Sequence, residues 1–157
     1  MSIGPAIRTD VFDVYIFKMS PSNFLQLKRA EEPLLNTWQP IMGHIESGEA
    51  TQTAMWREVE EEVGLTRNSP HFKGAWALEG VYPYYLARKD AIMMSPRFAV
   101  EVSDSWVPTL NSENSAFRWV GPEDLEDHFM WPGQRACICE ILNDIILRSI
   151  AEPFLRL

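Results

Sequence analysis

Six glutamates crowd the segment from residue 46 to residue 62, where the only base is Arg57. They are Glu46, Glu49, Glu58, Glu60, Glu61 and Glu62. With one base against six acids, this segment carries a charge of −5, out of −8 for the whole 157-residue chain. Carboxylate oxygens are hard ligands that suit Mg²⁺ or Mn²⁺. A cation held between them would allow even an acidic protein to bind phosphate groups.

The same segment predicts a helix over residues 50–63, closed by Gly64 just past its end. At about 100° per residue, three acids share one narrow face of this helix, namely Glu58, Glu61 and Glu62, whereas Glu60 points elsewhere. An apolar stripe on another side is expected to be buried, and it consists of Trp56, Val59 and Val63. The acids repel one another, and they lie where the helix dipole is already negative. Two interpretations stay open on this geometry: a solvated acidic face, or a face that a divalent cation neutralises.

Residues 43–65 read GHIESGEATQTAMWREVEEEVGL, and they resemble the Nudix box. That motif consists of Gly, five residues, Glu, seven residues, Arg-Glu, an aliphatic residue, any residue, Glu-Glu, any residue, Gly and an aliphatic residue. Every specified position is filled here, by Gly43, Glu49, Arg57, Glu58, Val59, Glu61, Glu62, Gly64 and Leu65. The resemblance favours metal binding over the solvated face.

Membership of the Nudix family would imply an α/β/α sandwich with a mixed sheet between helices. It would also imply Mg²⁺- or Mn²⁺-dependent hydrolysis of a nucleoside diphosphate linked to another group. The resemblance assigns Glu58 and Glu62 as primary metal ligands, and Glu61 as a further ligand or as the group that orients the attacking water. The Gly43 carbonyl is a further candidate ligand. Bound metal would neutralise the phosphate oxygens and activate the water, so that no protein nucleophile is needed.

Two more residues of the box have roles implied by the same resemblance. Arg57 belongs to the catalytic set, but it would pair with Glu49 to brace the loop rather than touch phosphate. Without the resemblance, Arg57 would be read as one half of a surface ion pair on a solvated helix. Gly64, like Glu49, has a structural place in the motif.

Three patches outside the box resemble the bacterial dihydroneopterin triphosphate pyrophosphatase (dATP pyrophosphohydrolase) group; they lie at residues 29–39, 112–119 and 131–135. This resemblance makes Glu113 a metal ligand from outside the helix and Arg29 a contact to substrate phosphate. The plainer alternatives are an ordinary loop acid and a strand-end surface charge. Asn114 stands where that group has His, and Phe117 where it has Tyr.

Aromatic side chains offer faces on which a base or a pterin ring could stack. The candidates are Trp38, Trp76, Tyr82, Tyr84, Tyr85 and Phe98, most of which must belong to the core. Trp38 and Tyr84 are the favoured ring contacts, and Gln39 could hydrogen-bond a ring edge or a phosphate.

The chain as a whole predicts six or seven short strands interleaved with two longer helices, one of which is the acidic helix. The expected strands are residues 11–19, 24–28, 38–42, 71–78, 82–87, 97–102 and 116–120; the first two should form a hairpin. A short helix is expected over residues 122–127 and a long amphipathic one over residues 134–150. This pattern predicts one α/β domain, residues 1–157, with helices on both faces of a mixed sheet.

The net charge of −8 argues against binding of a nucleic acid polymer. No apolar run is long enough to cross a membrane, and residues 1–5 lack the features of a signal peptide, so a cytoplasmic location is expected. The prediction is a Nudix hydrolase, monomeric or homodimeric, that cleaves a nucleoside triphosphate or pterin triphosphate to the monophosphate and pyrophosphate. Two alternatives remain: hydrolysis of dinucleoside polyphosphates or nucleoside diphosphate sugars, and a nucleotide-binding Nudix module without catalysis.

Overall fold

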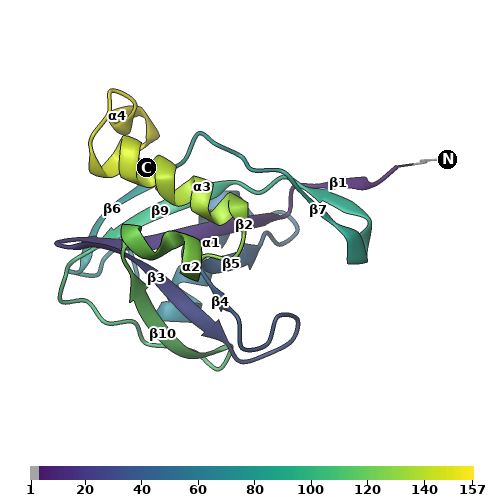
Figure 1. Ribbon diagram of the computed structural model, residues 1–157, viewed down its shortest axis with the longest axis horizontal. Helices are drawn as coiled ribbons and strands as arrows, with labels where there is room; N and C mark the ends of the chain where they lie inside the picture. The colour runs from purple at the N-terminus through teal and green to yellow at the C-terminus, as the bar shows by residue number, and fades with distance from the viewer. Residues whose placement is uncertain (1–3) are drawn as a thin grey trace.

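The computed structural model describes residues 4–157 and is built around a seven-stranded mixed sheet (Figure 1). Its strands are β2 (Val11–Met19), β3 (Ser22–Arg29), β4 (Trp38–Gln39), β5 (Ile41–His44), β6 (Phe72–Ala77), β9 (Arg97–Val102) and β10 (Asn114–Val120). They run in the order β10-β3-β2-β9-β6, with β4 paired to β3 and β5 paired to β2. Only β2 and β9 pair in parallel, whereas the other pairs of this sheet are antiparallel.

Helices cover the two faces of this sheet. The helix α1 (Thr51–Val63) packs on one face, and α3 (Pro132–Glu140), which continues as a π-helix over Ile141–Ile146, packs on the other. Shorter helical pieces are Pro122–Asp124, α2 (Leu125–His128) and α4 (Glu152–Leu155). The expected α/β class, with a mixed sheet between helices, is confirmed.

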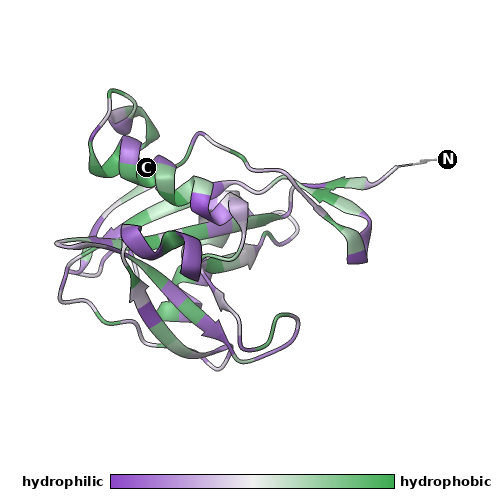
Figure 2. Cartoon of the chain, viewed as in Figure 1, coloured by the Kyte–Doolittle hydropathy of each residue, from purple (hydrophilic) through white to green (hydrophobic). Residues whose placement is uncertain are grey.

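The central strand β2 supplies both halves of the core because successive side chains point to opposite faces of a sheet. Phe12, Val14 and Ile16 belong to the cluster beneath α1, and Tyr15 and Phe17 belong to the cluster beneath α3. β3 and the edge strand β10 are less apolar than β2, and Figure 2 shows hydrophobic and hydrophilic bands along both.

A second, three-stranded sheet projects to one side of the main sheet (Figure 1). It consists of β1 (Ala6–Arg8), β8 (Ala91–Met93) and β7 (Tyr84–Leu86), and a 3₁₀ turn at Ala87–Lys89 joins β7 to β8. The sequence predicted β7 over residues 82–87 but missed β1 and β8. Each has three residues, too few to show a period, and β1 forms by pairing with a segment more than 80 residues away.

The predicted helix over residues 134–150 is wrong at both ends. The helix begins at Pro132, where proline suits the first turn, and regular α-structure ends at Glu140. Beyond the π-helical stretch, Arg148 has a positive φ of 52° and ends the helical path. Five apolar residues placed three or four apart over 138–146 look continuous in sequence, although the backbone there changes to the wider π turn.

Across residues 4–157, no helix has the length and apolar character needed to cross a membrane. The expectation drawn from residues 1–5 falls largely on positions 1–3, which lie outside the described residues.

Candidate active site at the acidic helix

The acidic face of α1 is fixed in place by the end of the helix. Gly64 adopts a left-handed conformation with φ of 70°, and its N–H donates to the Glu60 carbonyl. The buried side of α1 includes Val59 and Val63, as predicted. Glu62 lies at the edge of this buried side and is only 7% exposed, whereas Glu60 is exposed on another side.

Arg57 connects the helix to the loop before it. Its guanidinium donates two hydrogen bonds of 3.0 Å to the carboxylate of Glu49 and one of 3.0 Å to the His44 carbonyl. A third nitrogen donates to Glu58 at 2.7 Å and lies 3.7 Å from Glu61. The expected Arg57–Glu49 pair is therefore present, and the same arginine also holds two carboxylates of the acidic face. These contacts raise the pKa of Arg57, since each favours its charged form.

Glu62 is a buried carboxylate with few partners. Asn114 donates to it at 3.0 Å from the start of β10. Burial raises the pKa of Glu62 to about 7, the Asn114 hydrogen bond opposes the rise, and the nearby charges of Glu113 and Glu58 add to it. Burial also raises the pKa of Glu58, against the opposing effect of Arg57. A cation bound beside these two neighbouring carboxylates would stabilise their charged forms, which burial disfavours.

Gly43 is needed because β5 and α1 approach closely. A β-carbon at this position would lie 2.4 Å from Cζ of Phe12 and 2.6 Å from Cγ of Glu58. Any side chain would therefore push Glu58 or the core aside. The glycine therefore keeps the backbone of β5 next to Glu58.

Two of the residues predicted from outside the box, Arg29 and Glu113, act on the acidic face. Arg29, at the end of β3, pairs in register with Asn114 at the start of β10. The charge of Arg29 lowers the pKa of Glu62, while that of Glu113 raises it, so both side chains lie near Glu62. The Arg29 Nε donates to the Pro33 carbonyl at 2.9 Å.

This set of oxygen donors fits a divalent cation by its chemistry, because Glu62 is buried, short of partners and close to further carboxylates. The side chains do not form a closed set of ligands as they stand. Among residues 4–157, no three acidic, histidine or cysteine side chains converge tightly enough to hold an ion. Arg57 occupies Glu58 and Glu61, so both would have to reorient to bind a metal.

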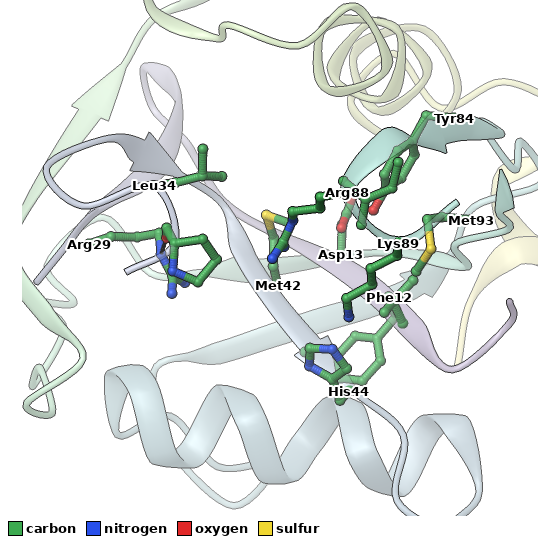
Figure 3. A pocket seen from close by; sticks show the side chains of 14 residues that line it. Phe12, Asp13, Arg29, Leu34, Met42, His44, Tyr84, Arg88, Lys89 and Met93 are labelled. Atoms are coloured by element: carbon green, nitrogen blue, oxygen red, sulfur yellow. Dashed lines mark hydrogen bonds between the residues drawn. The ribbon is translucent and has the colours of Figure 1, made fainter. Parts of the chain in front are cut away.

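A basic cavity of about 270 Å³ opens beside the acidic face. Its lining contains four bases, namely Arg29, His44, Arg88 and Lys89, but only one acid, Asp13. Gly43 lines it as well, so the cavity reaches the box itself. Figure 3 shows Arg88 and Lys89 extending from the β7–β8 connection over β5, with Lys89 directed toward His44.

An aromatic cavity of about 250 Å³ continues from the basic one. The two share six lining residues, namely Asp13, Leu34, Met42, Tyr84, Leu86 and Arg88. Tyr82, Tyr84 and Tyr85 of the β7 region face Trp131–Gln134 at the start of α3. Asp13 lines this cavity too, and one of its carboxylate oxygens lies 3.6 Å from Nε of Arg97. Burial raises the pKa of Asp13 to about 6, and Arg97 opposes the rise.

The structure separates the aromatic candidates. Tyr82, Tyr84 and Tyr85 line the aromatic cavity, while Trp76 and Phe98 belong to the core. Trp38 stacks against the Arg118 guanidinium at 4.3 Å, and Gln39 is buried in contact with Thr37, Met130 and Gln134. The sequence analysis missed Arg88 and Lys89, although two adjacent bases directly after a predicted strand were a usable signal.

Comparison with known proteins agrees with this geometry. Residues 8–141 match the family model described as the NUDIX domain. The chain belongs to the NUDIX family. Among solved structures, the E. coli dihydroneopterin triphosphate pyrophosphohydrolase superposes with a TM-score of 0.71 at 16% identity, covering 94% of this chain and 100% of that one. A C. elegans Ap4A hydrolase superposes with a TM-score of 0.70 at 18% identity, covering 87% and 96%. At these identities the likeness establishes the fold alone.

Curated relatives match only in part. An octanoyltransferase of Myxococcus xanthus is 30% identical over 103 residues, which is 64% of this chain and 27% of that protein. An RNA pyrophosphohydrolase of Haemophilus ducreyi is 43% identical over 60 residues, which is 36% of this chain and 29% of that protein. The aligned part of this NUDIX chain thus spans less than a third of each relative.

Proposed function

We propose that this NUDIX chain is a pyrophosphohydrolase that cleaves a nucleoside triphosphate or a pterin triphosphate to the monophosphate and pyrophosphate. The observation that carries the proposal is the junction between the acidic face of α1 and the basic cavity. Arg29 and Gly43 belong to both, since each lines the cavity and lies beside a glutamate of the helix. A phosphate chain is attracted to the bases and, through a cation, to the carboxylates, so the junction suits a phosphoanhydride.

Glu58 and Glu62 would hold the divalent cation, Mg²⁺ or Mn²⁺, with Glu61, Glu113 and the Gly43 carbonyl as further oxygen donors. Bound there, the cation would neutralise phosphate oxygens and lower the pKa of a water molecule. Glu61 is the most exposed carboxylate of the face, at 55%, and would orient the attacking water once it turns away from Arg57. Arg57 is a positioning residue, because its contacts are with Glu49, Glu58 and the loop rather than with the cavity.

The bases of the basic cavity would bind the phosphates that leave and those that stay. The charge of Arg29 acts on Glu62, so Arg29 is assigned to the phosphate next to the metal. Arg88 and Lys89 lie across the cavity from Arg29 and would hold the rest of the phosphate chain, and Arg88 also lines the aromatic cavity. Tyr84 borders both cavities and would contact the group attached to the phosphates.

Product analysis tests the reaction. The protein is incubated in Mg²⁺ with several nucleoside triphosphates, dihydroneopterin triphosphate, a dinucleoside tetraphosphate, a nucleoside diphosphate sugar and a 5′-triphosphorylated RNA. The expected products are pyrophosphate and a monophosphate, formed from the small triphosphates. Formation of two nucleotides or of a sugar phosphate would instead establish the alternative hydrolase. Release of pyrophosphate from the RNA alone would contradict a small-molecule substrate.

A matched pair of variants tests the site. Glu62→Gln is expected to lower turnover by orders of magnitude, because it removes a charge from the metal site. Glu60→Gln, the same change on the exposed side of α1, should leave turnover unchanged. Equal activity in the two variants would remove Glu62 from the site. Stabilisation by nucleotides without turnover in Mg²⁺ or Mn²⁺ would favour a binding module.

A further inference from the structure

Three buried polar groups around the aromatic cavity lack adequate partners in the protein. Nε of Arg97 and Oε1 of Gln134 are buried without a hydrogen-bond partner among the described residues. The Asp13 carboxylate receives one long hydrogen bond, from the Tyr15 hydroxyl at 3.4 Å, and Arg97 Nε at 3.6 Å lies beyond hydrogen-bond distance. Buried polar groups are normally satisfied, so a cluster of unsatisfied ones in a cavity indicates a ligand.

These groups are held in fixed orientations. Arg97 donates to the Gly133 carbonyl, and its guanidinium lies 5.4 Å from the centre of the Tyr82 ring. Gly133 permits this packing, because a β-carbon there would lie 2.9 Å from Nη2 of Arg97. Arg97 therefore cannot swing away to find another partner for its Nε.

The amide of Gln134 is oriented by its neighbours. Its Nε2 donates to Oε1 of Gln39 at 2.8 Å, and Nε2 of Gln39 donates in turn to the Thr37 hydroxyl at 3.2 Å. Thr37 uses its own proton on the Leu34 carbonyl, so the direction of this chain of hydrogen bonds is set. Oε1 of Gln134 is left as an acceptor among the residues that line the cavity.

The walls of the cavity suit a flat ring. Tyr82 and Trp131 are 40% and 46% exposed, unusually open for large aromatic side chains, and Tyr84 lies between them and the phosphate-binding side. Aromatic faces stack on heterocycles of many kinds, so they provide affinity without choosing among bases. The choice must come from the polar residues that line the cavity, namely Asp13, Arg97 and Gln134.

We propose that the aromatic cavity binds the heterocycle of the substrate and selects a 2-amino-4-oxopyrimidine edge, as found in guanine and in pterins. The ring N–H and the amino group would donate to Asp13 and Gln134, and the ring carbonyl would accept from Nε of Arg97. Adenine and cytosine fit worse, because each presents one amino group beside a ring nitrogen that is itself an acceptor. This assignment rests on the proposed function, since it names the ring attached to the phosphates in the basic cavity.

Substrate analogues test the selection on the unchanged protein. We expect kcat/KM for GTP to exceed that for inosine triphosphate, which lacks only the 2-amino group, by about tenfold or more, as for the loss of a hydrogen bond to a buried charge. Adenosine triphosphate should be poorer still, and dihydroneopterin triphosphate should rank with GTP. A GTP-to-inosine-triphosphate ratio below twofold, or a preference for adenine, would overturn the proposal.

The variant Asp13→Asn tests the carboxylate itself. It should reduce the GTP-to-inosine-triphosphate ratio to near one, and Asp127→Asn, the same change on the exposed surface of α2, should leave the ratio unaltered. A merely structural role for Asp13 would lower both activities and keep their ratio. If Asp13→Asn does not fold, the analogue series still decides the question.

Calorimetric binding of the monophosphates separates this proposal from the proposed function. Selective binding of GMP over IMP and AMP without hydrolysis of any triphosphate would uphold the ring assignment and refute the pyrophosphohydrolase. Hydrolysis of all the triphosphates at similar rates would uphold the pyrophosphohydrolase and refute the ring assignment.

Discussion

The burial of Glu62 predicts that a substitution which abolishes activity stabilises the metal-free protein at alkaline pH. The pKa of Glu62 rises from the ordinary 4.5 to about 7 in the fold, chiefly because the carboxylate is buried. That difference corresponds to at most about 3 kcal/mol of unfolding free energy. The folded state keeps a proton that the unfolded chain releases above pH 4.5, so this contribution is absent in acid and destabilising in full above pH 7.

Glutamine is neutral at every pH and can still accept the hydrogen bond from Asn114. In EDTA, Glu62→Gln should therefore unfold at the same urea concentration as the wild type near pH 4.5, and at a higher one at pH 8. The expected gain at pH 8 is about 1–3 kcal/mol. The shift of Asp13 acts in both proteins and cancels in the comparison. Removing the Glu62 charge also relieves its repulsion with Glu58, which adds to the gain in the same direction.

Urea unfolding followed by tryptophan fluorescence measures this difference, with Glu60→Gln as the control for loss of one acid from the same helix. Adding Mg²⁺ at pH 8 should stabilise the wild type, because a cation bound only to the folded state shifts the equilibrium toward it, and should stabilise Glu62→Gln much less. If Glu62→Gln is no more stable than the wild type at pH 8 in EDTA, the buried charge of Glu62 does not destabilise the metal-free fold and this reasoning is wrong.

Three further substitutions probe the parts around Glu62. Gly43→Ala places a methyl group 2.4 Å from Phe12, so it should cost about 1–3 kcal/mol of stability in urea unfolding and weaken Mg²⁺ binding by displacing Glu58. Arg57→Lys keeps the charge but loses the two-armed contact with Glu49, so kcat should fall while the KM for substrate changes little. Lys89→Ala should raise the KM for a triphosphate about two- to fivefold at low salt, an effect that should shrink in high salt.

The acidic helix could be predicted almost residue by residue, because its signals are local. Its apolar stripe repeats at the helical period, and Gly64 supplies the left-handed turn that ends it. The strand β9 was also placed within its observed limits, since six consecutive residues with β-branched and aromatic members sit between turn signals. Local signals conflict at the π-helical stretch and are too short at β1. In both places the secondary structure is determined by tertiary contacts.

In the candidate site, too, some features follow from local sequence signals and others depend on tertiary pairing. The box fixed the spacing of its own glutamates, so their arrangement on α1 followed from the helical period. The pairing of Arg29 with Asn114 depends instead on the register between β3 and β10, which no local pattern specifies. The basic cavity depends further on the small second sheet, because its turn brings Arg88 and Lys89 over β5. Sequence reasoning could not assemble that cavity without knowing that β1 and β8 pair.

Asp13 is the clearest signal that went unused. It interrupts VFDVYIFKM, a strand whose other residues from 12 to 17 are all buried and apolar or aromatic. A central strand covered on both faces by helices should read as a continuous hydrophobic run, and a carboxylate within it carries a cost that packing cannot offset. Arg97 offsets part of that cost, but at 3.6 Å it leaves the carboxylate short of donors. The proposed ring site would supply the donors that this carboxylate lacks, and a phosphate chain could not, because it carries negative charge and has no N–H to donate.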